Sequence, residues 1–153
     1  MSKDTNLKLE LYNKCLAFTQ DRLNTINKTI QELQESLTSE TKSSAGDKHE
    51  TGRAMLQLER EKAGQQLAEI QKINQLLAKI STESNSKTIG LGSVIYTTQA
   101  NYYIAISAGE FEIDKQKFYA IASNTPIAQL LLGKTIKDQI AFRDQSFTII
   151  NVI

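Results

Sequence analysis

The sequence predicts an α+β protein, in which an N-terminal antiparallel α-helical coiled-coil hairpin precedes a small antiparallel β domain with one short helix. Apolar residues in the first half recur at steps of three and four, as they do along a coiled-coil seam. After a polar Ser/Asn-rich stretch the period becomes that of strands. We expect the hairpin over 1–82 with its tip at 40–51, a linker at 83–88 and the β domain over 89–153.

The composition limits the partners that the chain can have. Its 153 residues carry a formal net charge of +1, with no basic stripe and no polybasic run. We therefore expect neither independent binding to duplex DNA nor attachment to an anionic membrane surface. No apolar run is long enough to span a bilayer and the N-terminus lacks a signal-peptide core, which favours a cytoplasmic location. The single cysteine, Cys15, excludes an internal disulfide and is interpreted as a buried small hydrophobe.

The first helix is predicted over Asp4–Ser39, a stretch without Pro or Gly. Its seam residues fall at alternating steps of three and four, namely Leu23, Ile26, Ile30, Leu33 and Leu37. At ~1.5 Å per residue such a helix is on the order of 50 Å long. A helix of that length needs a partner alongside it.

The polar stretch that follows is the expected apex, and its two carboxylates have two interpretations. Asp47 at the N-cap of the second helix with Glu50 three residues later is a capping-box pattern. Alternatively, the pair is displayed at the end of the hairpin to meet a metal or a cationic site on another molecule. His49, which lies between them, is expected to be an exposed tip residue, because one His without further nitrogen or thiolate ligands is a poor metal site.

The second helix carries the partner seam and two arginines. Its expected seam residues are Met55, Leu58, Ala63, Leu67, Ile70, Leu77 and Ile80. Arg53 and Arg60 are two turns apart near the apex. They belong either to a solvated charged face or to a small cationic strip that steers a nucleic-acid end.

The β domain is expected to hold five strands and one helix. The strands are predicted at Ser93–Thr98, Tyr102–Ser107, Phe118–Ala122, Gln139–Phe142 and Phe147–Val152, with a tight turn at Arg143–Ser146 before the last strand. Thr125 caps the helix, Pro126 takes its first position and Gly133 ends it. No phosphate-binding Gly-rich loop, nucleophile elbow or catalytic triad occurs here.

The segment Ala122–Gly133 and the residues just after it resemble the C-terminal domain of the bacterial transcript-cleavage factors GreA and GreB. The matching residues are Asn124, Pro126, Ile127, Ala128, Leu131, Leu132, Gly133, Lys134 and Asp138. The tip is similar as well, with Gly46, Asp47 and Glu50 in place. Thr51, Arg53 and Ala54 stand where the family has Asn, Glu and Tyr. The resemblance implies an FKBP-like fold for residues 89–153.

The resemblance also implies a function. A Gre-like transcription elongation factor binds RNA polymerase, inserts its coiled coil into the secondary channel and stimulates cleavage of backtracked RNA. Asp47 and Glu50 would then help to hold Mg²⁺ at the polymerase active site, near the 3′ end of the RNA. Arg53 and Arg60 would contact RNA or the partner. Such a protein is not an enzyme alone and binds no cofactor by itself.

Three other functions stay open. The altered tip residues favour a Gre-like regulator that occupies the same channel without stimulating cleavage. A long helical hairpin is also compatible with a structural or chaperone-like coiled-coil protein. A peptidyl-prolyl isomerase is suggested only by analogy of fold.

Overall fold

The computed structural model describes residues 3–42 and 46–153, and the side chains of residues 40–50 lie outside that description. The chain forms two compact units. Unit 1 comprises Met1–Phe18 and Gln75–Ile153, and unit 2 comprises Thr19–Asn74. The first two helices are α1 (Lys3–Lys42) and α2 (Gly46–Ala78), each of which contributes to both units.

Helix α1 accommodates threonines because their hydroxyl groups hydrogen-bond to its own backbone. The hydroxyls of Thr25, Thr29 and Thr38 each donate to the carbonyl four residues earlier, at 3.0 to 3.1 Å. This back-bonding lets a β-branched residue sit in a helix without an unpaired hydroxyl. Helix α1 extends to Lys42, three residues beyond the expected end at Ser39.

Unit 2 is held together by an apolar cluster that both helices supply. Its buried members are Ile26, Leu33, Ala63 and Ile70, and Leu23, Ile30, Leu56 and Leu67 pack against them half-buried. The seam predicted for α1 is therefore confirmed at Leu23, Ile26, Ile30 and Leu33. The seam predicted for the start of α2 is wrong, because Met55 and Leu58 are 60% and 64% exposed while Leu56 packs inward.

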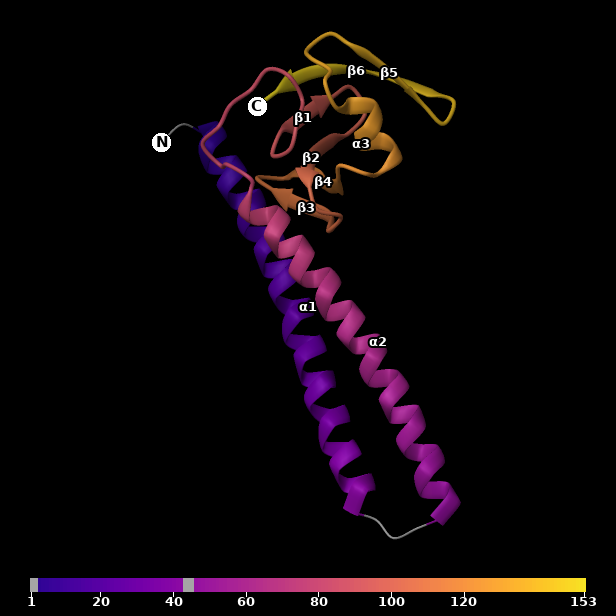
Figure 1. Ribbon diagram of the computed structural model, residues 1–153. Helices are drawn as coiled ribbons and strands as arrows, with labels where there is room; N and C mark the ends of the chain where they lie inside the picture. Colours follow the sequence, from indigo (N-terminus) through magenta and orange to yellow (C-terminus); the bar gives the residue numbers. More distant parts are fainter. Residues whose placement is uncertain (1–2, 43–45) are drawn as a thin grey trace. The chain divides into compact units, whose positions relative to one another are not determined.

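Unit 1 contains a six-stranded sheet with the strand order β3-β4-β2-β1-β6-β5 (Figure 1). The strands are β1 (Val94–Thr97), β2 (Asn101–Ala105), β3 (Gly109–Ile113), β4 (Gln116–Ala122), β5 (Gln139–Phe142) and β6 (Gln145–Val152). The expected α+β class is confirmed. The sheet is mixed rather than purely antiparallel, because β2 pairs with β4 in parallel.

Strand β3 was not predicted from the sequence; it begins at Gly109 and is followed by a tight hairpin turn. The two turn residues, Asp114 and Lys115, have φ of 51° and 66°. Arg143 and Asp144, between β5 and β6, have φ of 52° and 63°. Positive φ at both central residues is the signature of a type I′ turn, whose twist matches the strands on either side. Both hairpins thus use this turn without glycine.

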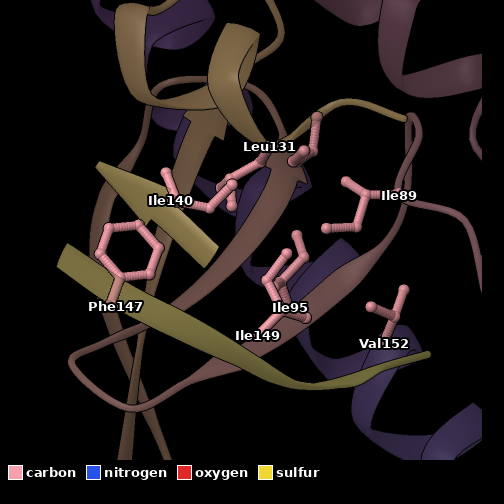
Figure 2. Close-up of a cluster of buried hydrophobic side chains, with 8 residues drawn as sticks. Ile89, Ile95, Leu131, Ile140, Phe147, Ile149 and Val152 are labelled. Carbon is pink, nitrogen blue, oxygen red and sulfur yellow. The ribbon is translucent and has the colours of Figure 1, made fainter. Parts of the chain in front are cut away.

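One face of the sheet carries the main apolar core of unit 1. Figure 2 shows side chains from β1, β5, β6, the loop before β1 and helix α3 (Pro126–Leu131) pointing toward one another. The buried members are Ile89, Ile95, Ile104, Leu131, Ile140, Phe147, Ile149 and Val152. Burial of this many branched and aromatic side chains supplies the dominant favourable term for folding of the unit, about 1.5–3 kcal/mol for each fully buried side chain.

The opposite face of the sheet is buried as well, in the half formed by β1, β2 and β4. Tyr103 and Phe118 have no exposed surface there, and their neighbours in unit 1 include the start of α1. Burial raises the pKa of Tyr103, and the nearby Cys15 and Tyr12 add to this effect. Strands that are covered on both sides read as continuous apolar runs rather than alternating ones. This explains the composition of Ser93–Thr98 and Tyr102–Ser107.

The segment expected as a linker is tied to the rest of unit 1 at several points. The ammonium of Lys8 donates to the carbonyl of Ser84 at 2.6 Å, and Thr135 Oγ1 donates to the carbonyl of Lys87 at 3.0 Å. The hydroxyl of Ser81 accepts from the backbone N–H groups of Glu83 and Ser84. These contacts fix the course of the chain between α2 and the sheet.

Candidate functional site

The expected tip at 40–51 includes both the end of α1 at Lys42 and the start of α2 at Gly46. The tip predicted at 40–51 is therefore helical on both sides of residues 43–45, which lie outside the described residues. Asp47 and Glu50 belong to the first turns of α2, three positions apart. Their side chains, and that of His49, lie outside the described residues. Whether Asp47 and Glu50 cap the helix or form a displayed pair stays a prediction.

The two arginines behind the apex differ in their surroundings. Arg53 is exposed, whereas Arg60 is half-buried. A Cβ atom placed on Gly64 would lie 3.2 Å from a guanidinium nitrogen of Arg60. The Arg60 side chain therefore runs toward Gly64, one turn further along α2 and away from Arg53. The missing side chain at Gly64 leaves room for this guanidinium.

Met55 and Leu58, which were predicted to lie in the seam, are exposed on the surface of α2. Positions three apart are neighbours on a helix surface, so the two side chains form a small apolar patch on α2. Counting back seven positions from the buried Ala63 gives Leu56 as the seam residue. This heptad register therefore leaves Met55 and Leu58 outside the seam. Ala63 is the smallest seam residue, and the larger neighbours Met55 and Leu58 concealed this register.

The motif around α3 has the local geometry that the sequence predicts. Thr125 is the N-cap, with its Oγ1 accepting from the N–H of Ala128 at 3.4 Å, and Pro126 stands at the first helical position. Gly133 follows the helix with φ of 82°. Only a residue without a Cβ atom adopts this conformation readily, which is the usual requirement just after a helix.

The same motif connects α3 to the start of the sheet region. Gly133 N donates to the carbonyl of Ile89, and Ile89 N donates to the carbonyl of Lys134, both at 2.9 Å. Ile127 packs against the main core, whereas Asn124 and Lys134 are exposed. Most of the motif therefore maintains the fold, and its exposed side chains are the ones available for a partner.

Within residues 3–42 and 46–153, as far as their side chains are described, no group of three or more His, Cys, Asp or Glu residues could hold a metal ion. In the same part of the chain no helix has the length and apolarity needed to cross a membrane.

The likeness of this chain to known proteins is found among solved structures and is weak. No protein-family model matches the chain, and no curated protein matches it significantly. Among solved structures, the transcription factor Gfh1 is similar at 18% sequence identity over 99% of this chain and 94% of that chain, with a TM-score of 0.34. Because the TM-score lies below 0.5, nothing about this chain is inferred from that likeness. The chain's own elements define it as an α+β protein with a helical hairpin followed by a six-stranded sheet.

Proposed function

We propose that this chain is a Gre-like transcription elongation factor that binds RNA polymerase, inserts its coiled coil into the secondary channel and stimulates cleavage of backtracked RNA. The observation that carries the proposal is the position of Asp47 and Glu50. They stand three residues apart at the start of α2, next to the connection between two long helices. The resemblance of the α3 region to the GreA and GreB family supports it.

The chemistry assigned to the carboxylates is that of ligands to a divalent cation. In two-metal phosphodiester hydrolysis, the cations stabilise the attacking and leaving oxygens. Carboxylate oxygens bind Mg²⁺ at about 2.1 Å, so the pair acts only when the hairpin brings it to the polymerase site. On this proposal the protein binds no Mg²⁺ alone and is not itself an enzyme. Arg53 and Arg60 contact RNA or the polymerase, and the protein works in the cytoplasm.

The test uses backtracked elongation complexes supplied with Mg²⁺. The protein should speed the release of short 3′ RNA fragments, and the double variant Asp47→Asn with Glu50→Gln should lose this effect. Asn caps a helix about as well as Asp, and Gln replaces Glu in a capping box, so helix α2 is preserved. The matched control is Glu32→Gln with Glu35→Gln, an exposed pair with the same spacing on α1. Equal activity of both double variants would remove the metal-ligand role.

A second candidate is a Gre-like regulator that occupies the channel without stimulating cleavage. Thr51, Arg53 and Ala54 favour it, because they differ from the family pattern beside the tip acids. It predicts binding to polymerase and inhibition of initiation, with no RNA fragments released in the same assay.

A third candidate is a chaperone-like coiled coil, and the exposed Met55 and Leu58 favour it. An apolar patch near the end of a helical hairpin suits contact with unfolded chains. This function predicts that the protein suppresses aggregation of a denatured client. Replacing both residues by Gln should abolish that effect and leave RNA cleavage unchanged.

A further inference from the structure

A polar cavity in unit 1 lies between the start of α1, the turn that follows α2 and the segment that leads into the sheet. Its volume is about 280 Å³. Among the described residues, the lining contains two lysines, hydroxyl side chains, glycines and one leucine, and no carboxylate. The lining residues are Lys8, Lys79, Ser81, Ser84, Ser86, Thr88, Gly90, Leu91, Gly92 and Ser93.

Lys8 is the unusual member of this lining, because only 5% of it is exposed. An ammonium carries three N–H donors. Within the described residues, Lys8 hydrogen-bonds to a single oxygen, the carbonyl of Ser84. A buried cation that lacks full hydrogen bonding is costly, and an anion that accepts from the remaining donors would offset this cost. Burial lowers the pKa of Lys8, and the charge of Asp4, which is not in the lining, opposes this shift.

Lys79 supplies a second positive charge to the same cavity. It is exposed, and its backbone N–H closes the last turn after α2 by donating to the carbonyl of Leu76. Two ammonium groups around one cavity without a lining carboxylate repel each other and attract a negative ligand.

The loop that completes the cavity is organised by its own hydrogen bonds. Gly90 N donates to Ser93 Oγ at 2.9 Å, and Ser86 Oγ donates to the carbonyl of Thr88 at 3.1 Å. A Cβ atom on Gly92 would lie only 3.1 Å from Ile80 Cγ2, so the loop is held close to the end of α2. In the described part of the chain, the hydroxyl hydrogens of Ser84 and Ser93 have no acceptor and can donate to a ligand. The donors are thus positioned before any ligand arrives.

We propose that this cavity binds a phosphate group, either as free phosphate or as the end of a larger phosphorylated ligand, between the ammonium groups of Lys8 and Lys79. The volume lies below the usual range for drug-sized ligands, about 300–1,000 Å³, which suits a small oxyanion. Charge-assisted hydrogen bonds from two lysines and from serine hydroxyls match its oxygens. This proposal is independent of the function proposed for the hairpin.

The test measures binding of inorganic phosphate, pyrophosphate and a nucleoside triphosphate at constant ionic strength, with a chelator present and sodium chloride as the reference. Calorimetry gives the affinity, and two-dimensional amide NMR gives the place. The amides of Thr88, Gly90 and Gly92 should shift with the phosphate compounds and not with chloride. Lys79→Gln should weaken binding by about tenfold, the cost of one charge-assisted contact.

Lys72→Gln is the matched control, because Lys72 is also exposed, lies on α2 seven positions before Lys79 and is not in the lining. It should bind as the unaltered protein does. Binding of phosphate alone indicates a site for the free ion, and binding only of the nucleoside triphosphate indicates the end of a larger ligand. Both results support the proposal. An absence of binding by all three compounds, or equal binding by the Lys79→Gln and Lys72→Gln variants, would overturn it.

Lys8→Met gives a second variant. It should abolish binding while circular dichroism still reports a folded chain. If the substitution unfolds the protein, the Lys79 comparison alone decides the outcome.

Discussion

The ammonium of Lys8 donates a hydrogen bond of 2.6 Å to the carbonyl of Ser84, 76 positions further along the chain. The contact fastens helix α1 to the segment that leads into the sheet. Because Lys8 is buried, the same contact makes the stability of the fold depend on the protonation of one amine.

The free energy of unfolding should depend on pH in a way that reports the titration of Lys8. Burial lowers the pKa of Lys8 below its ordinary value of 10.5, so the unfolded chain holds this proton to higher pH than the folded protein does. Stability rises with pH wherever the unfolded state binds more protons. Denaturant titrations from pH 7.5 to 10 should therefore show the unaltered protein gaining stability relative to Lys8→Met. The exposed Lys14→Met variant is the control, and its difference from the unaltered protein should stay constant. Parallel curves for both variants would contradict this prediction.

The thiol of Cys15 should be inert in the folded protein. Its side chain has no exposed surface, and burial raises its pKa from 9.0 to about 12. Since the thiolate is the reactive form, a thiol reagent at pH 8 should label Cys15 only when the chain unfolds. A Cys15→Ala protein with Ala17→Cys provides the control, because position 17 is exposed and should react at once. Rapid labelling of Cys15 without denaturant would show that this face of α1 is open.

The hydroxyl of Tyr103 is buried without a hydrogen-bond partner within the described residues. An unsatisfied buried polar group costs about 1–3 kcal/mol, and Phe keeps the ring without the hydroxyl. Tyr103→Phe should therefore leave the free energy of unfolding unchanged or raise it. A loss of more than about 1 kcal/mol, the net value of a typical hydrogen bond, would reveal a partner for this hydroxyl.

The register of α2 can be tested with two leucines that lie two positions apart. Leu56→Ala should cost about 1–2 kcal/mol, somewhat less than the 2–5 kcal/mol typical of a fully buried leucine, because Leu56 packs half-buried against the unit 2 cluster. Leu58→Ala, with the same change of helix propensity, should cost less than about 0.5 kcal/mol, as surface changes do. The midpoints of urea unfolding measure both effects. A reversed order would restore Leu58 to the seam.

Lys137 is a place where glycine should stabilise the fold. Its φ is 78°, in a turn closed by the hydrogen bond from Asp138 N to the carbonyl of Thr135. A non-glycine residue in this conformation costs roughly 1–2 kcal/mol. Lys137→Gly should therefore raise the stability by about 1 kcal/mol, after the greater freedom of glycine in the unfolded chain is counted. Lys134→Gly, at a position without positive φ, should give no gain in the same thermal melts.

The features that were predicted correctly from the sequence are those that depend on residues close together in the chain. Thr125, Pro126 and Gly133 act on their own backbone, and the structure places all three as predicted. The α1 seam also emerged, because the residues that form it repeat regularly. Strand β3 was missed since Gly109, Glu110 and Glu112 resemble a loop, and its partner lies across a hairpin whose turn lacks glycine.

Features that depend on residues far apart in the sequence could not be predicted in this way. The parallel pairing of β2 with β4 is set by the crossover through β3. Nothing near Lys8 distinguishes it from the exposed Lys14, and its burial follows from a contact with a distant carbonyl. For the tip, the spacing of Asp47 and Glu50 is compatible with a cap and with a displayed pair, and only the proposed variants separate the two.

Because the sheet is buried on both faces, only some truncated forms of the protein are expected to fold. A fragment that starts at residue 83 would discard the α1 residues in unit 1 and leave the rings of Tyr103 and Phe118 uncovered, so it should be recovered from inclusion bodies. Fusing residues 3–18 ahead of residue 75 through a short Gly/Ser-rich spacer would retain the described residues of unit 1. That shortened polypeptide should stay in solution, and it would provide a tipless competitor for any macromolecule that docks on the sheet-bearing half.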